Sequence, residues 1–215
     1  LKNYWPVGFG KVARRWVLGN IQKGHVENAR TSFSIRVPDT KNTDVVVDSF
    51  SGKVRLRDLT IRYNENFPNL NKVEATAVFS KNRFVANISS GVLKDLNIVS
   101  GVVKLFNLDT DKEEADIRAT VSGPLRTALT VTNNKPLRLV SKFGVDVTNV
   151  KGWSNTDLKF TFPLFASLTL EHVNVQARSK IVNVILPQTP LKKPIEAGNF
   201  DLVINSKGLS LSGYA

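Results

Sequence analysis

The sequence predicts an all-β protein of mainly antiparallel strands, with one N-terminal helix and one short internal helix. Two observations carry this prediction. Over most of the chain, apolar and polar residues alternate with a period of two, and polar, turn-like segments separate the alternating runs. Only the N-terminal segment shows a long helical period. Strands of this kind are apolar on one face, and that face must be covered by something.

Residues 5–22 form the long helical candidate. Val12, Trp16 and Gly19 fall on one helical face, and Gly24 supplies a stop signal. Beyond this segment the period changes to two, so we expect strands to follow.

The first half of the chain contains a bulge signal and a hairpin signal. The alternation slips by one residue at Arg57–Asp58, which predicts a β-bulge that restores the apolar face. Residues 80–83 separate two alternating runs and predict a hairpin turn. The expected strands of this half include residues 33–37, 54–63, 73–79, 84–88, 99–105 and 115–121.

Gly123–Pro124 interrupts the strand pattern. Pro124 suits a first helical position, and Leu125–Thr132 shows one or two helical turns, so we expect a short helix across an end or mouth of the sheet. Strands are expected to resume over residues 137–140, 145–150, 158–164, 170–177, 181–186, 200–204 and 209–213, with a proline-rich loop over 187–194.

A weak internal echo divides the strands into two related units. Residues 119–125 resemble residues 209–215, and each follows a series of alternating strands. We therefore expect a helical entry segment over residues 1–30 and a first β-unit over 31–123. A short helix and second β-unit follow over 124–215, continuous with the first, because no low-complexity linker separates them.

Composition limits the setting of the protein. The 215 residues include no methionine, even at position 1, so we interpret the chain as part of a longer polypeptide. Cysteine is also absent, which suits a periplasm as well as a cytoplasm. No apolar run is long enough to span a membrane, so any anchor is expected to precede Leu1 in the parent protein.

The formal charge of +12 favours polyanions, either nucleic acid or an anionic membrane surface. The basic residues are dispersed over all strands and loops, which fits solvation and edge protection of a sheet better than a phosphate-tracking stripe. Aromatic residues fall mostly on the apolar face. We therefore do not expect nucleic acid as a partner.

Motifs for catalysis, cofactors and metals were sought without success. His25 and His172 have no ligand-spaced companions, and Gly8–Ala13 lacks the strand and βαβ frame of a dinucleotide loop. No nucleophile elbow or phosphate-binding loop occurs. We expect no enzyme, cofactor or metal, although a glycosidase carboxylate pair drawn from distant strands would leave no trace in sequence.

Two architectures satisfy the one-sided strands. In one, a second sheet or a closed barrel covers the apolar face; in the other, a long curved sheet stays open and its apolar face holds lipid acyl chains. Small residues on the apolar face, such as Ala75, Ala77, Ala86 and Ala119, favour strong curvature or a narrow cavity, and they suit a tight barrel equally. The alternation alone leaves both open.

The N-terminal segment resembles a known entry motif. Its tryptophan–proline pair, its Ala-Arg-x-Trp segment and the asparagine and glycine that follow are similar to the start of the AsmA-like superfamily, in its YhdP-type branch. The residues that carry this resemblance are Trp5, Pro6, Ala13, Arg14, Arg15, Trp16, Val17, Asn20, Ile21, Gly24 and Ala29, with shorter matches at 122–125, 162–164 and 208–213.

This resemblance implies a function. The proteins that it resembles are anchored in the inner membrane and lie in the periplasm, and they have a long β-groove for phospholipid transport toward the outer membrane. It therefore implies a curved sheet with an open apolar groove, and a non-enzymatic module that binds phospholipid or another acyl-chain lipid. The competing expectation, from another class, is a β-sandwich or barrel that binds a protein or carbohydrate partner in the cell envelope.

On this basis candidate residues can be named. The helix residues Trp5, Arg14, Arg15 and Trp16 are expected to cap the groove or to lie near the anionic inner leaflet, unless the helix simply packs on the first strands. The expected groove lining consists of Val73, Ala75, Ala77, Phe84, Ala86, Val103, Leu105, Ile117, Ala119, Phe160, Phe162, Val175, Leu202 and Ile204.

Overall fold

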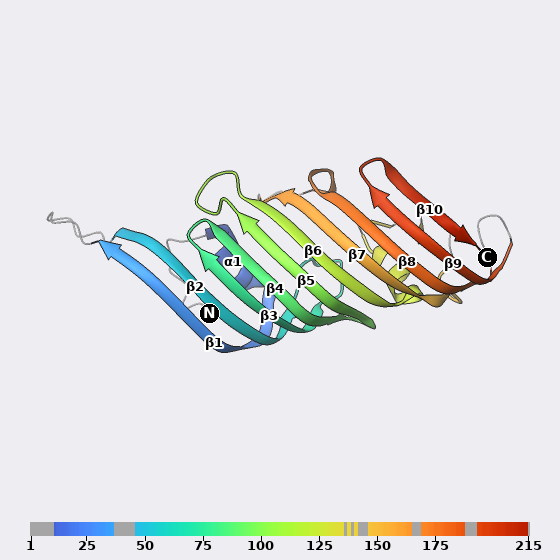
Figure 1. The fold of residues 1–215 in the computed structure, drawn as a ribbon, viewed down its shortest axis with the longest axis horizontal. Coiled ribbons are helices and arrows are strands. Elements are labelled where there is room, and N and C mark those ends of the chain that lie inside the picture. The colour runs from blue at the N-terminus through green and yellow to red at the C-terminus, as the bar shows by residue number, and fades with distance from the viewer. Residues whose placement is uncertain are drawn as a thin grey trace.

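The fold is a single ten-stranded antiparallel sheet that is curved and not closed into a barrel (Figure 1). The structure is a computed structural model, and it describes residues 11–36, 46–135, 137–138, 140–141, 146–164, 169–187 and 193–214. The strands follow one another in chain order from β1 at one edge to β10 at the other. The predicted all-β class with two α-helices is confirmed, and the closed-barrel alternative is not what the chain adopts.

The elements run in the following order. They are α1 (Lys11–Asn20), β1 (Ile21–Arg36), β2 (Val46–Ile61), β3 (Leu70–Ser80), β4 (Arg83–Leu93), β5 (Leu96–Phe106), β6 (Glu114–Pro124), α2 (Leu125–Thr132), β7 (Lys151–Pro163), the 3₁₀ turn η1 (Leu170–His172), β8 (Asn174–Leu186), β9 (Ile195–Asn205) and β10 (Gly208–Tyr214). Among the described residues, no helix has the length and apolarity to cross a membrane.

Two-residue turns join β3 to β4 and β4 to β5. The predicted hairpin at residues 80–83 joins β3 to β4, where Phe79 lies opposite Phe84. Between β4 and β5, Leu93 lies opposite Leu96, and Lys94 in the turn has a φ of 54°. A two-residue hairpin loop requires positive φ to match the right-handed strand twist. The pairing of these three strands is thus specified locally.

The predicted bulge at Arg57–Asp58 is confirmed. The pairing of β2 with β3 shifts between Leu56 and Leu59, and Asp58 has a φ of 51°. The extra residue lets the strand keep its apolar side chains on one face despite the slip in alternation. Opposite the bulge, Gly24 of β1 has a φ of 150°, and a Cβ there would collide with the Leu59 side chain. Only glycine fits this position.

Helix α2 packs over one end of the sheet, as expected. Pro124 precedes the helix as its N-cap residue, with a ψ of 129°, rather than occupying the first helical position. Each of two clusters of buried residues contains a residue of α2. The first contains Leu93, Leu96 and Val131, and the second contains Leu125, Val150 and Val184. Figure 1 draws the ribbon of α2, in yellow, behind the sheet at the ends of its strands.

Two strand predictions in the second half were wrong, and a third begins too early. The described parts of 137–140 and 145–150 contain no strand, and residues 170–172 form the 3₁₀ turn before β8 begins at Asn174. Val140 and Val150 are each 5% exposed, so their apolar character reflects burial near α2 rather than a strand. Short apolar runs do not by themselves distinguish these cases. At the N-terminus, helix α1 ends at Asn20, before the predicted end at residue 22, and residues 1–10 lie outside the described residues.

Candidate functional site

Strand register gathers the apolar side chains into rows that cross the sheet. Directly opposed residues of antiparallel strands carry their side chains on the same face, so a chain of pairs traces a row. We call two such chains the central rows. One consists of Val54, Ala77, Ala86, Val103, Ile117, Phe160 and Val175, and the other of Leu56, Ala75, Ile88, Gly101, Ala119, Leu158, Ala177 and Ile204.

The structure places every predicted lining residue on this one face. Phe84, Leu105 and Phe162 lie in a third row, through the pairs with Phe79 and Ala115. Val73 and Leu202 lie nearer the end that α2 covers; the missing side chain of Gly91 leaves room for Val73, and Leu202 pairs with Ser179.

Sequence reasoning omitted part of each row. Ile88, Leu158 and Ala177 belong to the second central row, although they were not among the expected lining residues. Their alternation was visible in the sequence, but nothing local indicated which residues of distant strands would be opposed. Register supplies that information.

The central rows lie outside the two buried clusters, although several of their alanines are buried. Neither buried cluster contains a residue of these rows, and the closest helix packing is of α2 against β6 and β7 and of α1 against β1. The larger side chains Val103, Ile117 and Phe160 are only partly buried. The alanines are more shielded, with Ala77 at 0% exposure, because the side chains around a single methyl group suffice to cover it.

Hydroxyl groups interrupt the apolar face at the α2 end of β7 and β8. Thr156 and Ser179 share a hydrogen bond of 2.8 Å between their side-chain oxygens, and the buried Ser154 donates to the backbone oxygen of Gly123 at 3.3 Å. Buried polar groups that satisfy one another add little cost to an apolar surface. These residues therefore leave the face compatible with an apolar ligand.

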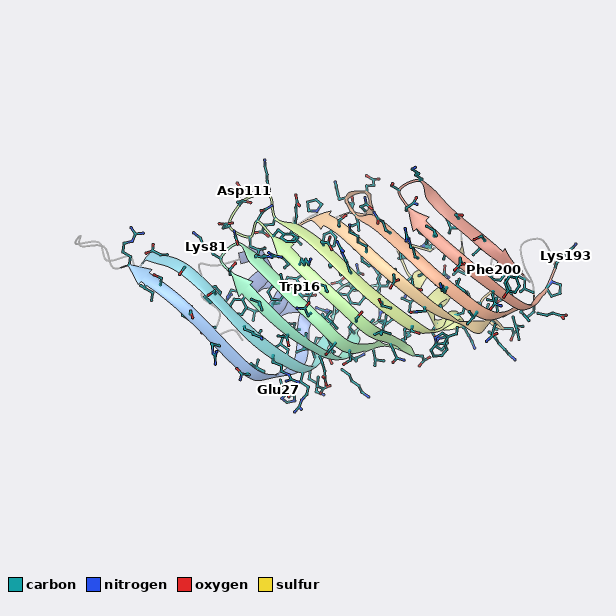
Figure 2. All side chains as sticks on the ribbon, viewed as in Figure 1. Trp16, Glu27, Lys81, Asp111, Lys193 and Phe200 are labelled. Carbon is teal, nitrogen blue, oxygen red and sulfur yellow. The ribbon has the colours of Figure 1, made fainter. Side chains whose placement is uncertain are left out.

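Helix α1 presents part of its expected motif to solvent. Trp16 is 45% exposed and Arg15 is exposed, whereas Arg14 is partly buried. The Asn20 side chain donates to the Trp16 backbone oxygen at 2.8 Å and closes the helix end. Trp5 lies outside the described residues. Figure 1 draws α1 behind β3 and β4, and Figure 2 places the label of Trp16 within the outline of the sheet rather than beyond its edge.

The opposite face of the sheet is polar and carries ion pairs. Asp116 accepts two hydrogen bonds from Arg118, at 3.0 and 3.2 Å, and these bonds hold the pKa of Asp116 below its usual range.

Burial raises the pKa of Tyr63 to about 12, so this phenol stays protonated. Within the described residues, no group of three histidine, cysteine or acidic side chains is placed to hold a metal ion.

This geometry defines a class of protein: a one-sided, open antiparallel sheet whose apolar face extends beyond its core. The model of the family described as YhdP protein matches residues 1–212. The chain therefore belongs to the YhdP family, and the predicted resemblance is confirmed.

Family membership indicates a module of an AsmA-like envelope protein, and the family is not known for enzymatic activity. The comparisons found no match among curated proteins or solved structures.

Proposed function

We propose that this chain is a non-enzymatic lipid-binding module of a periplasmic, AsmA-like protein whose parent chain is anchored in the inner membrane. Its central rows receive the acyl chains of phospholipids that pass between the inner and outer membranes. One observation carries this proposal: the two rows run without a charged residue from β2 to β8 and lie outside both buried clusters.

The energetics favour such a ligand. Burying one methylene group contributes roughly 0.8 kcal/mol, so ten methylenes along the rows contribute about 8 kcal/mol before the cost of ordering the chain. The effect is non-directional, which suits a ligand that must slide. Small residues such as Ala86, Gly101 and Ala119 let an acyl chain approach the backbone, while its charged headgroup stays in water.

Two neighbouring valines on β5 provide a matched test. Val103 lies on the apolar face opposite Ala86 and Ile117, whereas Val102 lies on the polar face opposite Asn87 and Arg118. Val103→Asp and Val102→Asp introduce the same charge at adjacent positions. Lipid that co-purifies with each protein is measured by native mass spectrometry and by extraction.

The wild type and Val102→Asp are expected to retain phospholipid, and Val103→Asp is expected to lose it while keeping the β-sheet circular dichroism of the wild type. Absence of lipid from the wild type contradicts the proposal. Unfolding of Val103→Asp but not of Val102→Asp also contradicts it, because that result shows a packed core at Val103.

A further inference from the structure

The polar face of β1, β2 and β3 contains a shallow depression surrounded by cations. Its volume is about 350 Å³, and its lining consists of Asn28, Arg30, Lys53, Arg55 and Thr76. It lies on the side of the sheet opposite the central rows, because Arg55 follows Val54 and precedes Leu56 on the same strand. The function proposed above makes no use of it.

Register brings two of these cations face to face. Arg30 of β1 lies directly opposite Lys53 of β2, and Arg55 lies opposite Asn28 on one side and Thr76 on the other. Like charges directly opposed across an antiparallel pair are destabilising. The sheet therefore carries an unfavourable pair at this position unless an anion lies between the two side chains.

The nearby carboxylate is already engaged. Glu27 forms two ion pairs, with Arg55 Nε at 3.0 Å through one oxygen and with Arg57 Nη1 at 2.9 Å through the other. No ion pair joins Arg30 or Lys53 to any carboxylate in the part of the chain that the structure describes. One acid thus serves two arginines, and the opposed pair beside them has no counter-charge.

Three cations elsewhere on the same face have an acid opposite them or within ion-pair distance. Lys180 of β8 lies opposite Asp201 of β9, and Asp116 lies within ion-pair distance of both Arg118 and Lys159. Arg30 and Lys53 differ from these cations, because no ion pair joins either of them to a carboxylate among the described residues.

We propose that this depression binds a multiply charged phosphate group. Arg30, Lys53 and Arg55 surround the anion from two strands, and an arginine guanidinium matches phosphate with paired N–H donors. The Asn28 amide and the Thr76 hydroxyl supply neutral donors of the kind that phosphate oxygens accept. Such a group is present both in soluble phosphate monoesters and in the headgroup of phosphatidic acid, and binding experiments distinguish these two sources.

The first experiment measures binding by the complete 215-residue chain. Pyrophosphate is titrated by calorimetry at low salt, and flotation is measured with vesicles of phosphatidic acid in phosphatidylcholine and of phosphatidylcholine alone. Lys53→Gln is compared with Lys180→Gln, which removes the same charge from the same face. The affinity for the bound probe is expected to fall at least tenfold in Lys53→Gln and to change less than twofold in Lys180→Gln.

Each outcome is decisive. Pyrophosphate binding that Lys53→Gln removes supports a site for phosphate of either source. Binding confined to phosphatidic acid vesicles and removed by Lys53→Gln supports the headgroup as the source. If neither probe binds, or if Lys53→Gln and Lys180→Gln weaken binding equally, the proposal is overturned.

A second measurement separates the site from a general loss of stability. In phosphate-free buffer, Arg30→Gln and Lys53→Gln are expected to melt at or above the wild-type temperature, because each removes one of two opposed like charges. Pyrophosphate is expected to raise the melting temperature of the wild type and not that of Lys53→Gln. A lower melting temperature of both variants in phosphate-free buffer, with the same pyrophosphate response as the wild type, contradicts the site.

Discussion

The two ends of strand β5 both alternate, with a one-residue slip at Val99–Ser100 between them, but they lie in different environments. At one end, Leu96 is 4% exposed and packs against Val131 of α2. At the other, Val103 and Leu105 are only partly buried and belong to neither buried cluster. Figure 2 shows side chains along both ends of the strands. Alternation therefore specifies an apolar face, and whether that face becomes a core depends on what the rest of the chain places over it.

Matched truncations on β5 give the largest expected contrast. Leu96→Ala is expected to lower the free energy of unfolding by about 3 kcal/mol, because it leaves a cavity between the sheet and α2. Leu105→Ala removes the same atoms from a partly exposed site and is expected to cost about 1 kcal/mol. Urea unfolding of both variants measures the difference, and equal losses would show that both ends of β5 are core.

Alanine substitutions of two glycines on the apolar face compare the packing at the covered end with the packing in a central row. A Cβ on Gly123 would lie 2.8 Å from Leu96 Cδ2 and 2.9 Å from the Asp95 backbone oxygen, whereas one on Gly101 would lie 3.3 Å from the Arg118 backbone oxygen. Gly123→Ala is expected to destabilise by about 2 kcal/mol through overpacking at the covered end. Gly101→Ala is expected to change stability by less than about 1 kcal/mol, because the contact is looser and alanine loses less backbone entropy. Thermal unfolding that ranks the two variants in the reverse order contradicts this description of the covered end.

The polar face is expected to contribute least to stability. Hydrogen bonds from Arg118 lower the pKa of Asp116, so its contribution is present above the ordinary aspartate pKa of about 3.9 and is lost as pH falls through the lowered value. Asp116→Asn is expected to cost less than about 1 kcal/mol at pH 7. The difference in free energy of unfolding between the Asp116→Asn variant and the wild type should become smaller in acid. Urea midpoints across this range measure the effect, and a gap that widens in acid argues against the assignment.

Local signals in the sequence predicted much of the fold. The bulge at Arg57–Asp58, the hairpin at 80–83 and the short helix Leu125–Thr132 each depend on residues close together in the chain, and all three are confirmed. The strands expected over 137–140 and 145–150 are absent because apolar residues there are buried near α2 instead.

The candidate sites required information that the sequence does not hold locally. The register between strands decides which residues lie opposite each other, and it joins segments that are distant in the chain. It places Arg30 opposite Lys53 and Ala119 opposite Leu158. Alternation indicated which side chains share the apolar face, but it gave neither their rows nor the cover that α2 provides. For the same reason, the net charge of +12 did not indicate that Arg30 and Lys53 would lie together without a carboxylate partner.

Accessibility of single labels tests the open apolar face most directly. The chain contains no cysteine, so Ile117→Cys, Val131→Cys and Asn87→Cys each carry one nitroxide. The three labels lie in a central row, on the buried side of α2 and on the polar face respectively. Collision with a water-soluble relaxation agent is measured by electron paramagnetic resonance with and without phospholipid. The label at Ile117 is predicted to be accessible without lipid and protected with it, while Val131 stays protected and Asn87 stays accessible. A label at Ile117 that is already immobile and protected without lipid would show a closed core and contradict the account.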